Sequence, residues 1–174
     1  MIKTTKTHAF FYTEWPSNFT KTHFTWSKFK ECHEFFTTEQ AFMWAKAKFF
    51  KDEESAEKIL EEKHLPMVCK MLGREVKNYD DNLWSKVRYD YMLSVNIEKF
   101  SQDAKLRVKI LDSKFDGLEF VEASPRDCVW GVGLALDDSK IIDPANWRGR
   151  NLLGKALTET RRVVIGLEKQ NSLG

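Results

Sequence analysis

Two hydrophobic patterns follow one another along the chain, and together they predict an α+β fold that is predominantly helical. The first third contains aromatic runs with partial alternation, typical of short strands joined by turns: "HAFFY" at 8–12, "HFTWSKF" at 23–29 and "HEFF" at 33–36. Beyond them, apolar residues recur mostly at the spacing of amphipathic helices. "LEFVEAS" at 118–124 is the best late strand. We expect a compact single domain over 1–174 with a small β-sheet, and no alternating βαβ units.

Capping residues predict where the helices begin and end. Thr37, with Gln40 three residues later, forms a capping-box pattern that starts a helix reaching about Asp52. Pro66 suits the first position of a helix that Gly73 would end. The other helices are expected at 55–63, at 80–100 with a cap near Asp81 or Asn82, at 103–111, and at 151–167 with a cap at Asn151.

The helix that starts after Thr37 places two charged residues on its apolar face. At about 100° per residue, Glu39 and Lys46 share that face with Phe42, Met43, Phe49 and Phe50. They lie two turns apart, roughly 10 Å, which is too far for an ion pair but suits two groups reaching into one pocket. Lys48 falls on the far side, near Ala41 and Trp44, and can be a solvated charge. The structural alternative is a first-turn acid that complements the helix dipole and a lysine that snorkels to water.

A second helix, at 80–100, combines an aromatic residue with a cation. Trp84 and Arg88 are one turn apart on a stripe that includes Tyr91. The functional interpretation is an aromatic platform for a base beside a cation for phosphate or sugar oxygens. The structural alternative is an arginine stacked on a core tryptophan. The sequence leaves both open.

The segment "ASPRDCVWGVGL" at 123–134 contains three candidate residues, Asp127, Trp130 and Gly131. A Rossmann fingerprint would need a third glycine and a following helix, so dinucleotide binding by that fold is excluded. Asp127 either caps the turn or presents a carboxylate to a sugar.

The segment "NWRGRNLLGKAL" at 146–157 predicts a phosphate seat. Arg148 and Arg150 flank a glycine immediately before the helix start at Asn151. Exposed N–H groups and the helix dipole already favour an anion at such a position. A solvated basic turn is the alternative.

Composition narrows the classes of partner. The net charge of +2, from 28 Lys and Arg against 26 Asp and Glu, gives no whole-chain attraction for nucleic acid or membranes. The three cysteines are scattered without C-x-x-C spacing, and we expect a reduced cytoplasmic protein. Cys32 and His33, with His23 nearby, fit no usual ligand set, so we expect no metal.

Assembled in order, these segments resemble the NADAR, or YbiA-like, domain family along nearly the whole chain. The resemblance rests on "SNF" at 17–19, "TEQAFMWAKAKFF" at 38–50, "LGREV" at 72–76, Trp84 with Arg88 and Met92, "VEASPRDCVWGVGL" at 121–134 and "WRGRNLLGKAL" at 147–157. It implies a compact, largely helical domain with N-glycosidase chemistry on ribosides, which requires no cofactor.

The resemblance also implies roles for single residues. The family's glutamate falls on Glu39, its helix lysine on Lys46 and its loop acid on Asp127. Glu39 would be the main acid/base or stabilising carboxylate and Asp127 a second sugar-binding carboxylate. In a second hypothesis, Lys46 is a nucleophile that forms a Schiff base. The residues expected to bind substrate are Asn18, Trp84, Arg88, Trp130, Gly131, Arg148, Arg150 and Asn151.

Two functions follow from the resemblance, and a third, from another class, is their rival. The first is cleavage of ribosylaminopyrimidine 5′-phosphates, intermediates of riboflavin biosynthesis, although that type has a more glycine-rich segment than 132–147 here. The second is removal of ADP-ribose from modified guanine in a nucleoside or in DNA. Near-neutral charge argues against a large DNA footprint, but a flipped base could still be served. The third is a non-catalytic sensor of NAD or ADP-ribose.

Overall fold

The computed structural model describes residues 2–173, and its internal contacts divide the chain into two compact units. The central unit is Asn18–Ala104, and the terminal unit joins Met1–Ser17 to Lys105–Gly174. Helices make up 53% of the chain, which confirms the predominantly helical α+β fold. A single domain over 1–174 stays a prediction. Among residues 2–173, no helix has both the length and the apolar composition needed to cross a membrane.

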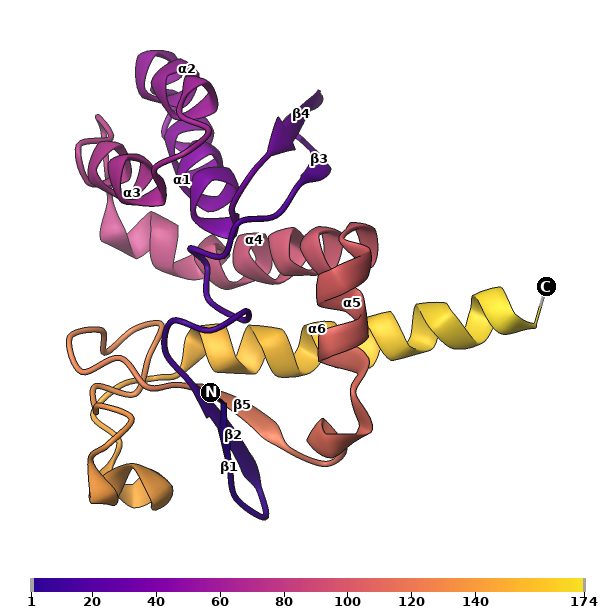
Figure 1. Ribbon diagram of the computed structural model, residues 1–174. Helices are drawn as coiled ribbons and strands as arrows, with labels where there is room; N and C mark the ends of the chain where they lie inside the picture. Colours follow the sequence, from indigo (N-terminus) through magenta and orange to yellow (C-terminus); the bar gives the residue numbers. More distant parts are fainter. Residues whose placement is uncertain (1, 174) are drawn as a thin grey trace. The chain divides into compact units, whose positions relative to one another are not determined.

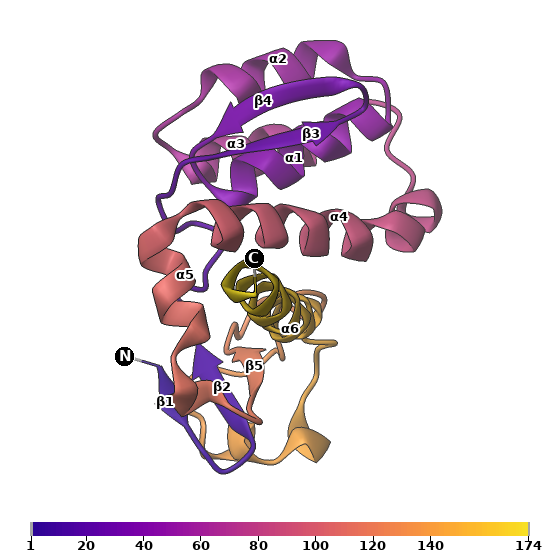
Figure 2. The same ribbon diagram turned by 90° about the vertical axis from the view of Figure 1, so that its right-hand side faces the viewer.

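The central unit packs three helices and a β-hairpin around one buried helix. Its elements are β3 (Phe24–Lys28), β4 (Glu31–Phe35), α1 (Thr38–Phe49), α2 (Glu53–Glu61), α3 (Pro66–Arg74) and α4 (Asp81–Gln102). Strands β3 and β4 pair antiparallel, with Phe24 opposite Phe35 and Trp26 opposite His33. Helix α1 contacts α2, α3, α4 and β4, as Figures 1 and 2 show. This arrangement leaves α1 with no solvent face.

Burial of α1 on all sides corrects the expectation of one apolar and one solvated face. Ala41 and Trp44, placed by the helical wheel on the far side, are both 0% exposed. Lys48 is not a solvated charge, since its side chain is 12% exposed and its Nζ lies 2.7 Å from Glu31 and 2.6 Å from Glu53. The helical-wheel interpretation treated the charge of Lys48 as a sign of a solvated face. Ion pairs with residues of neighbouring elements instead compensate this charge and allow it to be buried.

The predicted start of α1 is confirmed, and its predicted end is wrong. The Thr37 side chain accepts a hydrogen bond from the Gln40 N–H at 3.1 Å, which caps the helix. Helix α1 ends at Phe49 instead of reaching Asp52, because Asp52 is the N-cap of α2. Lys51, with a φ of 58°, turns the chain between the two helices.

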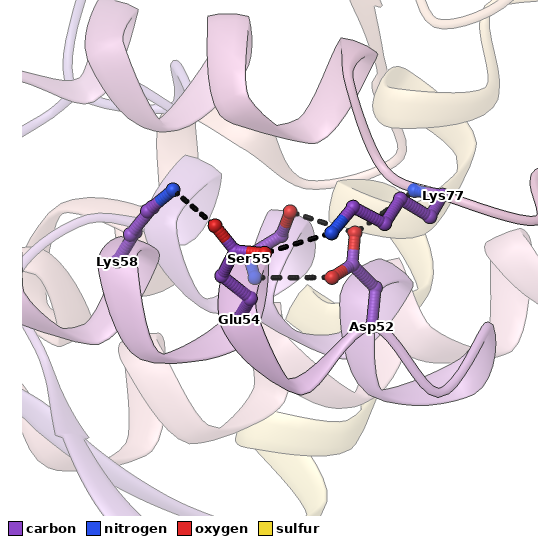
Figure 3. A network of polar contacts seen from close by, with 5 residues as sticks. All are labelled: Asp52, Glu54, Ser55, Lys58 and Lys77. Carbon is purple, nitrogen blue, oxygen red and sulfur yellow. Dashed lines mark hydrogen bonds and ion pairs between the residues drawn. The ribbon is translucent and has the colours of Figure 1, made fainter.

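Asp52 also fastens the segment that follows α3, as Figure 3 shows. Its carboxylate accepts hydrogen bonds from the Ser55 N–H at 3.2 Å, the Ser55 hydroxyl at 2.7 Å and the Lys77 N–H at 2.8 Å. The Lys77 ammonium lies 2.7 Å from Glu54, which also pairs with Lys58. Asp52 is 4% exposed, so these bonds satisfy a buried carboxylate.

Gly73 does not end α3, which continues to Arg74. A Cβ at Gly73 would lie 2.0 Å from the sulfur of Met43, so glycine permits the close approach of α3 to α1. The N-cap of α4 is Asp80, one residue before the first of the two predicted caps. Its side chain accepts a hydrogen bond from the Leu83 N–H at 3.2 Å.

The terminal unit contains a second small sheet, which pairs the two N-terminal strands with a late strand. Its elements are β1 (Lys3–Thr4), β2 (His8–Phe11), α5 (Ala104–Leu111), β5 (Glu119–Glu122), α6 (Leu152–Ser172) and three 3-10 turns at Ser113–Phe115, Ser139–Ile142 and Pro144–Asn146. Strand β2 pairs antiparallel with β1 and parallel with β5. The aromatic runs predicted as one sheet therefore form two sheets, because the first run pairs with the late strand.

Candidate active site

Lys46 lies among polar groups that the end of α3 and the start of α4 supply. Its Nζ donates a 2.7 Å hydrogen bond to the carbonyl of Gly73. The same atom lies 4.1 Å from the centroid of the Tyr79 ring, a cation–π contact. The Tyr79 hydroxyl donates to Asp81 at 2.7 Å, and Arg88 approaches the same Asp81 oxygen at 3.7 Å. We call these four residues, Lys46, Tyr79, Asp81 and Arg88, the central cluster.

Burial dominates the electrostatics of Lys46. Burial lowers the pKa of Lys46 below the usual lysine value; Asp81 opposes this, Arg74 adds to it, and Glu39 opposes it. At a given pH, the amine is therefore deprotonated more often than that of a solvated lysine.

Glu39 is 6% exposed, in the first turn of α1, where its charge complements the helix dipole. Its N–H donates to the Asn18 carbonyl at 3.0 Å, which places the "SNF" segment against the start of the helix. The side-chain oxygen of Asn18 is buried and accepts no hydrogen bond within residues 2–173. The two charged residues that the sequence placed on the apolar face of α1 are thus covered, Lys46 in part and Glu39 almost fully.

Trp84 is 4% exposed, and its ring is surrounded by other aromatic rings. Tyr91 stacks on it at 5.6 Å between centroids with 20° between the planes. Phe42, Phe49 and Phe50 lie at 5.3, 5.8 and 6.2 Å. This packing favours the alternative in which Trp84 is a core residue, because neither face of the ring is left open for a base to stack on.

Tyr79 was not among the residues that the sequence singled out. It follows Asn78, whose φ of 58° is left-handed, in a segment without hydrophobic periodicity. It is 45% exposed, and its ring edge packs on Phe50 at 5.4 Å. Partial burial and the hydrogen bond to Asp81 raise the pKa of Tyr79 to about 12, so its hydroxyl remains a donor. Only the tyrosine in the polar stretch "NYDD" could have drawn attention to it.

In the terminal unit, Asp127 caps its own turn. One carboxylate oxygen accepts from the Val129 N–H at 2.9 Å and the Trp130 N–H at 2.7 Å. The capping alternative is confirmed, and a sugar contact stays a prediction. Gly131 is buried, and a Cβ there would lie 2.8 Å from Ser124, so close packing explains this glycine.

The predicted phosphate seat at Asn151 is closed by backbone hydrogen bonds. The N–H groups of Leu152 and Leu153, the first of α6, donate to the carbonyls of Val129 and Trp130, both at 3.1 Å. The Asn151 side chain does not cap the helix. Its oxygen accepts from the Glu122 N–H of β5 and its amide donates to the Phe120 carbonyl, both at 3.0 Å. The helix dipole remains, but the free donors that would hold a phosphate are already used.

Arg148 and Arg150 nevertheless remain exposed on this loop. Their N–H groups donate to Val132 and Cys128, both at 2.9 Å, while within residues 2–173 neither guanidinium makes an ion pair or side-chain hydrogen bond. They match the solvated basic turn that was the alternative to the seat.

The predicted site residues therefore fall into two groups. Asn18, Glu39, Lys46, Trp84 and Arg88 belong to the central unit, and Asp127, Trp130, Gly131, Arg148, Arg150 and Asn151 to the terminal unit. The roles of all eleven residues stay predictions. In the described part of the chain, no three His, Cys, Asp or Glu side chains are grouped to hold a metal ion.

Comparison with known proteins gives consistent matches. The NADAR domain matches residues 2–164. Protein irg-1 of Caenorhabditis elegans is 40% identical over 132 residues, which span 75% of this chain and 61% of that protein. An N-glycosidase of Acanthamoeba polyphaga mimivirus is 37% identical over 134 residues, 76% of each chain. N-glycosidase YbiA of Shigella flexneri is 31% identical over 122 residues, 66% of this chain and 68% of its own.

A solved structure agrees with these sequence matches. The NMR structure of the E. coli protein YbiA superposes with a TM-score of 0.71 at 26% identity, covering 97% of this chain and 90% of that one.

Proposed function

This chain belongs to the NADAR domain family and is a hydrolase of N-glycosyl bonds, and we propose that its substrate is a ribosylaminopyrimidine 5′-phosphate of riboflavin biosynthesis. The observation that carries the proposal is the half-buried Lys46 on the same buried helix as Glu39. A charged pair in a helix with no solvent face is costly unless it is used or compensated.

The reaction itself sets what the site must provide. Breaking a ribosyl C–N bond builds positive charge on the anomeric carbon and negative charge on the departing base. The enzyme therefore needs an electron-rich group near the sugar and a proton for the base. Lys46 and Glu39 are the two groups on α1 that can supply them.

Lys46 acts as the nucleophile in the mechanism that we favour. Its neutral amine attacks the anomeric carbon, the C–N bond to the base breaks with its electron pair on the base, and Glu39 gives that nitrogen a proton. One amine proton then passes to the Glu39 carboxylate and the other to the ring oxygen as its bond to the anomeric carbon breaks, which opens the ring and leaves a Schiff base on Nζ. Water then adds to the imine carbon, and release of ribose 5-phosphate restores the amine.

The local contacts of Lys46 suit this cycle. Burial lowers the pKa of Lys46 and so increases the neutral fraction that can attack. The Gly73 carbonyl at 2.7 Å and the Tyr79 ring at 4.1 Å stabilise the ammonium form between turnovers. The substrate would have to replace these contacts when it reaches Nζ.

The test is mass spectrometry of the products of two separate incubations, one with the ribosylaminopyrimidine phosphate and one with ADP-ribosylated guanosine. We expect ribose 5-phosphate from the first, lost in Glu39→Gln and retained in the matched Glu57→Gln, which alters an exposed residue of α2. ADP-ribose from the second incubation alone would make the chain an ADP-ribosyl-guanine hydrolase. No product from either, with tight ADP-ribose binding by calorimetry, would identify a sensor.

A further inference from the structure

Arg88 is a buried guanidinium whose donors are only partly used. The residue is 8% exposed, and its Nε makes no hydrogen bond in the described part of the chain. Its one ion pair, to Asp81, is 3.7 Å long, well beyond the roughly 2.8 Å of a charge-assisted hydrogen bond. That Asp81 oxygen already accepts from the Tyr79 hydroxyl at 2.7 Å. A buried, planar fork of donors is thus left incompletely compensated.

Arg74 supplies a second cation near Lys46, on which its charge acts. It is the residue after Gly73, whose carbonyl accepts the Lys46 hydrogen bond. Arg74 is exposed, and its guanidinium makes no hydrogen bond or ion pair within residues 2–173. The structural alternative is that it only complements the dipole at the end of α3.

We propose that Arg74 and Arg88 bind the 5-phosphate of the ribose whose anomeric bond is cleaved, beside Lys46. The inference rests on the proposed function and adds the group that positions its substrate. Guanidinium groups hold phosphate oxygens through paired N–H donors, which fixes orientation as well as charge. The anomeric carbon and the 5-phosphate belong to one sugar, so a phosphate site next to the catalytic lysine has the right reach.

Arg74 and Arg88 bring two guanidinium groups to the surroundings of Lys46 and Tyr79, where the carboxylates of Glu39, Asp80 and Asp81 also act. Lys46 adds a third positive charge only in its ammonium form. The loop of the terminal unit offers fewer free backbone donors for a phosphate, because the first N–H groups of α6 donate to the Val129 and Trp130 carbonyls. We therefore assign the phosphate site, which the sequence placed on that loop, to Arg74 and Arg88.

The ligand is a 5-phosphorylated ribose, whichever base it carries. A ribosylaminopyrimidine phosphate presents it as a monoester, and an ADP-ribosylated base presents it within a diphosphate. Both have the same spacing from phosphorus to the anomeric carbon. Parallel assays of the two substrates distinguish these sources.

The experiment removes the arginine and the phosphate separately and together. Steady-state kinetics of wild type and Arg74→Gln are measured on the riboside with and without its 5-phosphate. We expect Arg74→Gln to reduce kcat/KM about tenfold to a hundredfold on the phosphorylated riboside, and less than about twofold on the riboside without phosphate. Arg74 is exposed, so its loss leaves folding intact.

Two further variants locate the effect. Arg88→Lys keeps the buried charge but not the fork, and we expect the same phosphate-dependent loss. The matched control is Arg162→Gln, at an exposed arginine of α6, which should leave both substrates unaffected. Arg150→Gln tests the rival loop of the terminal unit. Equal losses of Arg74→Gln on both substrates, or a phosphate-dependent loss in Arg150→Gln without one in Arg74→Gln, would overturn the proposal.

A binding measurement separates this inference from the proposed function. Calorimetry with ribose 5-phosphate and with ribose needs no turnover. We expect only the phosphorylated sugar to bind wild type, and Arg74→Gln to weaken that binding at least about tenfold. This result with no turnover of any riboside would refute the function and keep the site. Turnover with unchanged ribose 5-phosphate binding in the variant would refute the site alone.

Discussion

The two units hold their arginines in opposite ways. In the central unit, Arg88 is buried among helices, and its donors are short of partners. In the terminal unit, Arg148 and Arg150 extend from a loop whose backbone donors are satisfied and whose guanidinium groups face solvent. A buried unsatisfied donor is costly, and an exposed arginine costs almost nothing. The comparison teaches that burial and unmet bonding point to a ligand more reliably than a motif rich in arginine.

The largest effect is expected at Lys46. Lys46→Ala should lower kcat/KM about a thousandfold, as loss of a catalytic group commonly does, while Lys86→Ala, at an exposed lysine of α4, should match wild type. Borohydride added during turnover should trap a sugar adduct on wild type and on Lys86→Ala only. Turnover without any trapped adduct would count against the covalent route.

The next largest effect tests the loop of the terminal unit. A Cβ at Gly149 would lie 2.2 Å from the Gly131 carbonyl and 2.8 Å from the Cys128 Cα, both backbone atoms. Gly149→Ala should therefore lower the free energy of unfolding by about 3 kcal/mol in urea denaturation. Gly166→Ala, inside α6 with open space around it, should be neutral or stabilising by up to about 1 kcal/mol. Equal stability of both variants would mean that the loop backbone is not packed as described.

A pH-dependent effect concerns a second buried lysine of the central unit. Burial lowers the pKa of Lys99 to about 7, and Asp103 partly opposes the shift. In the unfolded chain, the Lys99 side chain has a pKa near 10.4, so between these two values the unfolded state binds more protons than the folded state. The free energy of unfolding therefore rises with pH from about 7 to 10. In urea denaturation, Lys99→Met should lose most of this rise, whereas Lys86→Met should retain it. A parallel rise in wild type and Lys99→Met would contradict the lowered pKa.

The smallest effect is expected at the exposed arginines. Arg150→Gln should change the free energy of unfolding by less than about 0.5 kcal/mol, because the side chain contributes no bond to the fold. Arg88→Gln should cost several times more, since it leaves a buried site with altered donors. Thermal denaturation of the pair measures the contrast directly, and equal shifts would remove the distinction between the two units.

The sequence predicted the features that depend on local spacing. The cap at Thr37, the helical class of the chain and the burial of Glu39 all follow from residues a few positions apart. The compensation of Lys48 by Glu31 could not be predicted in this way, because it depends on how a hairpin packs against α1.

The errors at the site have the same origin. Asn151 stands where an N-cap was predicted, but its side chain bonds to β5, about 30 residues earlier in the chain. Tyr79 reaches Lys46 only because α3 turns back on α1. Contacts between distant segments carry no periodic signal, and they decide which donors of a motif stay free.

The hydrogen bonds of Asp52 hold together the two ends of the segment that contains α2 and α3. The hydrogen bond from the Lys77 N–H to Asp52 closes a loop across 25 positions, and Tyr79 follows two residues later. Such a segment is expected to open as one cooperative unit in hydrogen exchange. Its opening would release the tyrosine and uncover Lys46 in the same event. The exchange rate of the Lys77 amide would then measure how often the lysine is laid open without substrate.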